Sequence, residues 1–143
     1  MAHILNGGRS CSQVGILYHG EAEWVGDAMF FQKPGRICME QQVDYDVIPA
    51  EKISYPDLLP CLNDNQELIL GTLHLKYLII PYAQKLPISV LHGIAALSEH
   101  GFPVLFIDAF PSDSCEHVDA TKLLSIIRKK ATCLPLTAFA AFL

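Results

Sequence analysis

Short apolar blocks alternate with amphipathic blocks along the chain, and this order limits the possible folds more than any other feature. The block 102–110, FPVLFIDAF, is almost continuously apolar, as expected for a strand that is covered on both faces. Strands that alternate with helices form a mostly parallel sheet with helices on both sides, so the sequence predicts an α/β fold. We expect strands over 14–19, 45–49, 76–83 and 102–110, a hairpin or edge strand over 67–75, and helices over 34–43, 87–101 and 118–131.

Local signals set the ends of these helices. Pro34 is expected at the first position of its helix, where the missing N–H leaves no hydrogen bond unmade. Gly101 follows the apolar periodicity of 87–101 and is expected to end that helix. The helix 118–131 is amphipathic and has basic residues in its last turns, which the helix dipole favours.

Length, charge and composition exclude several classes of protein. A chain of 143 residues, 51% of them hydrophobic, fits one globular domain with a real core. The formal net charge of −5 offers no basic surface for nucleic acid or an anionic membrane. No apolar run approaches the ~20 residues of a membrane-spanning helix, and the first residues do not resemble a signal peptide. We expect a cytoplasmic protein with no nucleic-acid or membrane partner.

The cysteines of the chain include no C-x-x-C pair, so their spacing predicts neither a zinc ribbon nor a thioredoxin-like site. Small buried thiols in a reducing cytosol account for them. They are Cys11, Cys38, Cys61, Cys115 and Cys133.

The segment 17–34, LYHGEAEWVGDAMFFQKP, crowds polar and aromatic residues just after the first expected strand. Parallel α/β sheets bind their ligands beyond the carboxyl ends of the strands. That rule places this segment together with 81–85 and 108–113 at one edge of the sheet. A segment of this kind is either a site or one wall of an interface.

His19, Glu21 and Glu23 alternate, so an extended backbone would place them on one face, as in a metal or acid/base site. The small residues between them also allow a turn, which would leave the carboxylates solvated or capping. Two carboxylates this close on one loop rarely face each other across a glycosidic bond, which disfavours a glycosidase pair. We expect no metal and no cofactor.

Trp24, the only tryptophan, lies in the same loop. An exposed indole beside carboxylates is typical of sugar sites, where the ring stacks on the sugar and the acids bind hydroxyls. The alternative is a ring buried under the loop with its N–H satisfied. Both alternatives stay open from the sequence.

The apolar block PVLFIDAF resembles the strand and turn that carry the nucleophile in class I glutamine amidotransferase-like domains, with the pattern P-V-x-G-x-C-x-G. Pro103 and Val104 match, but Asp108 stands in the cysteine position. Phe106 and Phe110 stand where that pattern has glycines. We therefore expect Asp108 to be structural, accepting backbone N–H bonds, and we expect no catalytic residue in this chain.

A second part of that pattern is altered as well. The run 79–83, IIPYA, resembles the strand ending in P-G-G that supplies the oxyanion hole, yet Tyr82 and Ala83 replace the glycines. Cys115, the nearest thiol, lies beyond the turn and has no obvious base at a fixed spacing. The fold pattern is kept while the catalytic groups are lost.

Taken over most of its length, the chain resembles the glutamine amidotransferase-like domain inside large bacterial glycoside hydrolases, related to the β-galactosidase trimerisation domain. The matching segments are 3–9, 14–36, 44–51, 76–83 and 101–111. The resemblance implies a flavodoxin-like three-layer α/β sandwich that follows a catalytic (β/α)8 barrel. The hydrolytic carboxylates would belong to that barrel. Expected partners are the barrel of the same polypeptide and further copies in a homo-oligomer, with carbohydrate bound only by the intact enzyme.

The resemblance also gives the crowded loop a role, because the loop would face the barrel or a neighbouring subunit. Its candidate ligand or interface residues are His19, Glu21, Glu23, Trp24, Gln32 and Lys33.

The resemblance divides the chain into an interdomain linker remnant, 1–13, and the amidotransferase-like domain, 14–143. The apolar tail 131–143 is expected to pack on something outside this chain, as in a fragment of a longer polypeptide. Two other functions stay open: a self-contained amidotransferase-like hydrolase, and a small-ligand binding domain of flavodoxin-like shape. The acidic loop after the first strand disfavours the latter, because phosphate-binding loops are rich in Gly, Ser and Thr.

Overall fold

The computed structural model describes residues 13–19, 26, 28–53, 62–63, 67–70, 73–116 and 119–142. Its central sheet consists of β1 (Val14–Tyr18), β2 (Tyr45–Pro49), β5 (Tyr77–Ile80), β7 (Val104–Ile107) and β9 (Thr132–Leu134). The helices are α2 (Gln32–Glu40), α3 (Ile88–Glu99), α4 (Thr121–Lys130), α5 (Leu136–Phe142) and the 3-10 helix η2 (Ala50–Ile53). Two small strand pairs lie outside the central sheet: β3 (Leu68–Leu70) with β4 (Leu73–Leu75), and β6 (Lys85–Leu86) with β8 (Asp113–Ser114).

Every strand pair of the central sheet is parallel, and the strand order is β2-β1-β5-β7-β9. Val14 is in register with both Tyr45 and Tyr77, so β1 lies between β2 and β5. The strand order therefore reverses at β1, because the chain adds β2 on one side and later strands on the other. The α/β class and the parallel sheet predicted from the sequence are confirmed, as is the antiparallel hairpin within 67–75.

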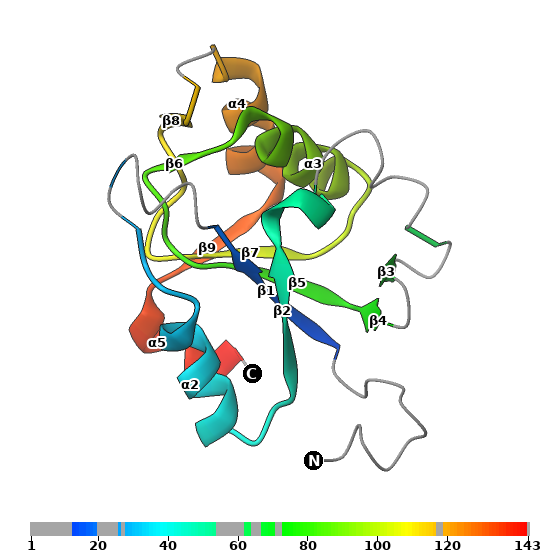
Figure 1. The fold of residues 1–143 in the computed structure, drawn as a ribbon, viewed down its shortest axis with the longest axis vertical. Coiled ribbons are helices and arrows are strands. Elements are labelled where there is room, and N and C mark those ends of the chain that lie inside the picture. Colours follow the sequence, from blue (N-terminus) through cyan, green and yellow to red (C-terminus); the bar gives the residue numbers. More distant parts are fainter. Residues whose placement is uncertain are drawn as a thin grey trace.

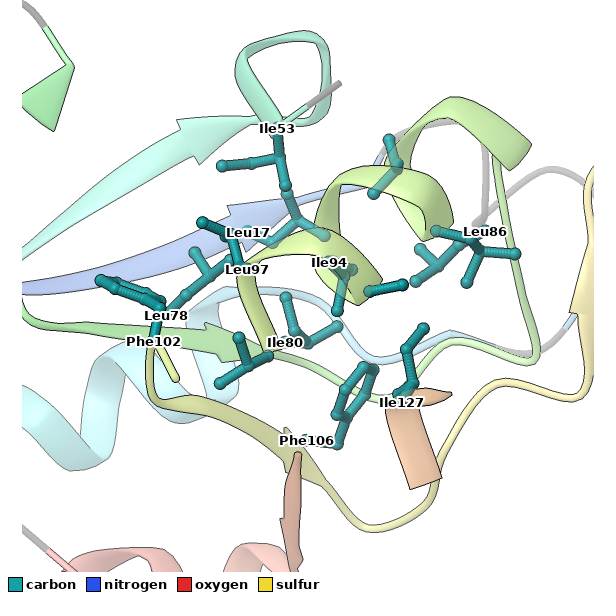
Figure 2. Packing of buried hydrophobic residues seen from close by; sticks show 14 of the residues in the cluster. Leu17, Ile53, Leu78, Ile80, Leu86, Ile94, Leu97, Phe102, Phe106 and Ile127 are labelled. Atoms are coloured by element: carbon teal, nitrogen blue, oxygen red, sulfur yellow. The ribbon is translucent and has the colours of Figure 1, made fainter. Parts of the chain in front are cut away.

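Helices cover both faces of this sheet, with α3 and α4 on one side and α2 and α5 on the other (Figure 1). On the first face Leu78, Ile80 and Phe106 from the strands pack with Ile94 of α3 and Ile127 of α4 (Figure 2). Each of these side chains is at most 1% exposed. Their burial explains why the strand blocks are apolar without interruption.

Alternate residues of the same strands point to the opposite face. There Ile16, Ile79 and Ile107 pack with Cys38 of α2 and Phe139 of α5. Since α2 has only nine residues, α5 supplies much of the cover over this second cluster.

The expectation that the apolar tail packs on something outside the chain is wrong for its described part. β9 is the fifth strand of the central sheet, and Phe139 is fully buried against the sheet of the same domain. The tail is apolar because it completes this fold.

The ends of α2 differ from the predicted 34–43. The helix starts two residues earlier, and Pro34 is its third residue, still among the first N–H positions that have no partner inside a helix. It ends earlier because Gln42 takes a left-handed φ of 59°. Val43 N then donates to Cys38 O (2.8 Å), which closes the helix as a glycine usually would.

The end of α3 is the one predicted. Gly101 has a φ of 83° and donates its N–H to Ser98 O (3.1 Å). Phe102 N donates to Leu97 O (3.0 Å), so both last carbonyls are satisfied by the following turn.

Candidate functional site

The segments that follow β1 and β5 are joined at the carboxyl edge of the sheet, beside the strand-order reversal. Met29 N donates to Tyr82 O (2.6 Å), and Ala28 forms an antiparallel bridge with Ala83. A parallel sheet usually keeps its ligand crevice at such a reversal. Here residues 28–29 lie across the end of β5.

The segment after β7 is tied to the same edge. Lys85 and Leu86 of β6 pair in parallel with Asp113 and Ser114 of β8. The N–H of Ser112 (2.9 Å) and its hydroxyl (3.2 Å) both donate to one backbone carbonyl, that of the residue just before β6. Loops that could form a site are therefore held by short backbone ladders.

Asp108, in the nucleophile position of the amidotransferase pattern, directly follows β7 and has a φ of 72°. Ala109 N donates to Ile107 O (3.0 Å), which closes a γ-turn centred on Asp108. Asp108 N donates to Leu134 O at the end of β9 (2.7 Å). A positive φ is unusual for a residue with a Cβ, although Asp tolerates it better than most. Both N–H groups at this turn are used by backbone carbonyls.

The carboxylate of Asp108 binds the start of α5. Its Oδ1 accepts the N–H of Leu136 at 2.8 Å, in a solvent-exposed position. The first N–H groups of a helix have no intrahelical partner and favour negative charge. Asp108 thus accepts a backbone N–H bond, as expected, but the donor is in α5 and the bond is exposed rather than buried.

Aromatic rings occupy the two glycine positions of the same pattern. Phe106 is 1% exposed, and its ring centroid lies 5.1 Å from that of Phe110 at an interplanar angle of 55°. The space that glycines leave beside a nucleophile is filled here by side chains.

The amino end of α3 is also occupied by the protein itself. Glu116 Oε1 accepts the N–H of Ile88, the first residue of α3, at 3.0 Å. No sequence signal indicated this contact, because the two residues are 28 positions apart.

The residues predicted for the loop are in different environments. His19 is buried, at 2% exposure, directly after β1. Gln32 and Lys33 are exposed in the first turn of α2. The other predicted residues, Glu21, Glu23 and Trp24, lie outside the described residues.

Two exposed aromatic residues flank this loop and were not singled out from the sequence. Tyr18 is 44% and Phe30 is 56% exposed. The Tyr18 ring meets the Phe31 ring edge to face at 5.9 Å, so the two ends of the loop are close together. The sequence feature that could have indicated them is an aromatic residue at each end of a polar stretch.

The described residues include no group of three His, Cys, Asp or Glu side chains placed to hold a metal ion. Cys38, Cys115 and Cys133 are free thiols. Burial raises the pKa of Cys38 to about 11. Burial and, secondarily, the Asp108 carboxylate raise the pKa of Cys133. The thiolate is the nucleophilic form, so Cys38 and Cys133 are poor nucleophiles at neutral pH.

Comparisons with protein-family models, curated proteins and solved structures found no match to this chain. Across the described part of the chain, no helix has the length and apolar character that crossing a bilayer requires.

Proposed function

We propose that this chain is a non-catalytic accessory and assembly domain of a carbohydrate-processing glycoside hydrolase. Numbered along the chain, the central strands have the order 2-1-3-4-5, which supports a flavodoxin-like fold. The resemblance of residues 101–111 to the amidotransferase pattern supports the finer class. The domain packs on an upstream (β/α)8 barrel of the same polypeptide or on a neighbouring subunit. We place it in a cytoplasmic homo-oligomer, and the free thiols at Cys38 and Cys133 fit the reducing compartment.

The closed turn at Asp108 is the observation that supports the non-catalytic part of this proposal. Acyl transfer needs a nucleophile and free N–H donors aimed at the developing oxyanion. Here the N–H groups of Asp108 and Ala109 already donate to backbone oxygens. The carboxylate accepts the N–H of Leu136. Every polar group that amidotransferase chemistry would use at this turn has a structural partner instead.

The amino end of α3 argues against the small-ligand alternative. Phosphate groups of flavins and nucleotides bind where a helix presents free N–H groups and a positive dipole end. The Glu116 carboxylate already accepts the first N–H of α3 and would repel a phosphate. The described residues therefore favour a protein partner over a phosphate-bearing cofactor.

The aromatic residues that flank the loop form the centre of the proposed partner surface. Tyr18 and Phe30 are large and exposed, and Gln32 and Lys33 add polar groups beside them. Aromatic centres with a polar rim are typical of protein interfaces. This surface lies at the carboxyl edge, where the resemblance places the barrel or a second subunit.

We expect the chain by itself to release no ammonia from glutamine. The reason is that the turn at Asp108 offers neither a strong nucleophile nor free oxyanion donors. Coupled ammonia assays on the wild-type chain and on Asp108→Ala check this. Ammonia release that Asp108→Ala abolishes would instead establish the self-contained hydrolase.

In the intact polypeptide, Phe30→Glu is expected to weaken assembly by about tenfold or more, because a charge replaces an apolar contact at an interface centre. Glycosidase turnover should fall with it. Analytical ultracentrifugation and turnover measurements check both effects. Met39→Glu is the matched control, since Met39 on α2 is 69% exposed but lies away from the loop. Equal assembly of both variants, or a coding sequence without a sugar-hydrolysing barrel, would contradict the proposal.

A further inference from the structure

The two outermost strands of the central sheet, β2 and β9, leave unpaired backbone at opposite sides of the domain. In the described part of the chain β2 pairs with β1 alone and β9 pairs with β7 alone. A strand at the edge of a sheet keeps one row of N–H and C=O groups free, and such a row can pair with another chain. We call the two regions the β2 side (residues 44–52) and the β9 side (residues 121–134).

The β9 side is basic. Arg128, Lys129 and Lys130 are the last three residues of α4, and only Ala131 separates them from β9. All three are exposed, and none of them forms a salt bridge with any residue that the structure describes. The helix dipole favours cations at this end, but three adjacent cations also repel one another. The range 121–134 contains no acidic residue that would offset them.

The β2 side is acidic and partly apolar. Asp44 directly precedes β2 and is exposed, and Glu51 is exposed in η2 just after the strand. The range 44–52 contains more acidic than basic residues, so the net charge of this side is negative. Val47, in the middle of β2, is 38% exposed. This side therefore presents an apolar side chain between two carboxylates.

The two sides match in register as well as in charge. β2 and β9 both belong to one parallel sheet, so their amino ends lie at the same end of it. If β2 of a second copy continues the sheet beyond β9, the residue before that β2 lies beside the residues before β9. Asp44 of the second copy then lies against the basic last turn of α4. Opposite charges at corresponding positions favour this register over the reversed one.

We propose that copies of this chain associate head to tail, with the β9 side of one copy against the β2 side of the next. This inference rests on the homo-oligomer in the proposed function and names its contact surface. A second copy is the partner that the observations favour, because one chain carries both complementary sides. A membrane surface is disfavoured, since Leu124 and Ile127 on the apolar face of α4 are buried in the domain. A contact of this heterologous kind forms a ring when the rotation between copies closes.

Sedimentation velocity of the 143-residue chain over a range of protein concentrations tests the contact. We expect reversible self-association that weakens about tenfold or more between about 0.05 and 0.5 M NaCl, because salt screens exposed charges. Lys129→Glu combined with Lys130→Glu should weaken it about tenfold or more, and so should Asp44→Lys. Lys122→Glu is the matched control, because it reverses an exposed lysine at the other end of α4 and should associate like the wild type.

Mixing the two defective variants tests whether the contact is heterologous. Asp44→Lys keeps the basic β9 side, and the double lysine variant keeps the acidic β2 side, so the mixture can form one native contact. We expect a one-to-one heterodimer from two proteins that are each monomeric. Circular dichroism should show that both are folded, because the changed side chains are exposed. If glutamates disturb the end of α4, Lys129→Gln with Lys130→Gln replaces the double variant and should weaken association about threefold.

Three results would overturn the proposal: a monomeric wild type at every concentration, a mixture of folded variants that stays monomeric, or a Lys122→Glu effect as large as that of the double variant. Heparin binding through the same lysines in a chain that does not self-associate would assign the β9 side to a polyanion instead. Failure of this contact is distinguishable from failure of the proposed function. A monomeric chain can still pack on a barrel of the same polypeptide, and turnover of the intact Phe30→Glu variant tests that packing separately.

Discussion

Replacing Phe139 with alanine is expected to lower the free energy of unfolding by about 3–5 kcal/mol, the usual effect of truncating a buried phenylalanine. Phe139 is fully buried in α5 and packs with residues of three central strands, among them Ile16, Ile79 and Ile107. No other residue of α5 is buried to the same degree. Urea titrations of the wild type and the variant measure the difference.

Phe142→Ala is the matched control, because it truncates the same side chain in the same helix. Phe142 is 42% exposed and stacks on Phe139 with centroids 6.4 Å apart. We expect Phe142→Ala to lower the free energy of unfolding by only about 1 kcal/mol. If Phe139→Ala leaves no folded protein to titrate, Phe139→Leu keeps most of the buried volume and gives a measurable loss. Equal losses for Phe139→Ala and Phe142→Ala would mean that the burial of Phe139 contributes no more to stability than the exposed ring of Phe142.

Local sequence patterns were sufficient to predict the strands and helices that fill the middle of the fold. The block 102–110 is apolar because both faces of β7 are covered, and that burial leaves a direct trace in the sequence. The last strand and helix leave no such trace. β9 has only three residues, none of them buried, and α5 has only seven residues, so both are too short for a periodic signal. Their structure depends on the sheet they complete.

The candidate site was predictable only in part, for a similar reason. The altered nucleophile position at Asp108 could be recognised in the local pattern. Its hydrogen-bond donor, Leu136 N, is 28 residues away in the helix that the sequence did not reveal. The contact of Glu116 with the first residue of α3 also joins two residues that are 28 positions apart. Long-range contacts between irregular segments depend on the folded chain and leave no periodic signal.

Phe106→Ala is expected to lower the free energy of unfolding by about 3–5 kcal/mol, although it moves the sequence toward the small residue of the amidotransferase pattern. Phe106 is 1% exposed at the end of β7 and packs with Ile80 and Ile127 in the main cluster (Figure 2). Truncation would leave a cavity under the turn at Asp108. Chemical denaturation measures the loss, and the ammonia assay should still detect no release from glutamine.

Phe110→Ala provides the comparison, because Phe110 is only partly buried and contacts Phe106 from beyond the turn. We expect a smaller loss for it. In the double variant, the two losses should fall short of additivity by about 0.5–1.5 kcal/mol, the coupling of one aromatic pair. Additive losses in the double variant would show that the two rings do not stabilise each other. An unchanged free energy of unfolding in Phe106→Ala would mean that the space under the turn is open. Only with that second result would room remain for a substrate where the amidotransferase pattern has its glycines.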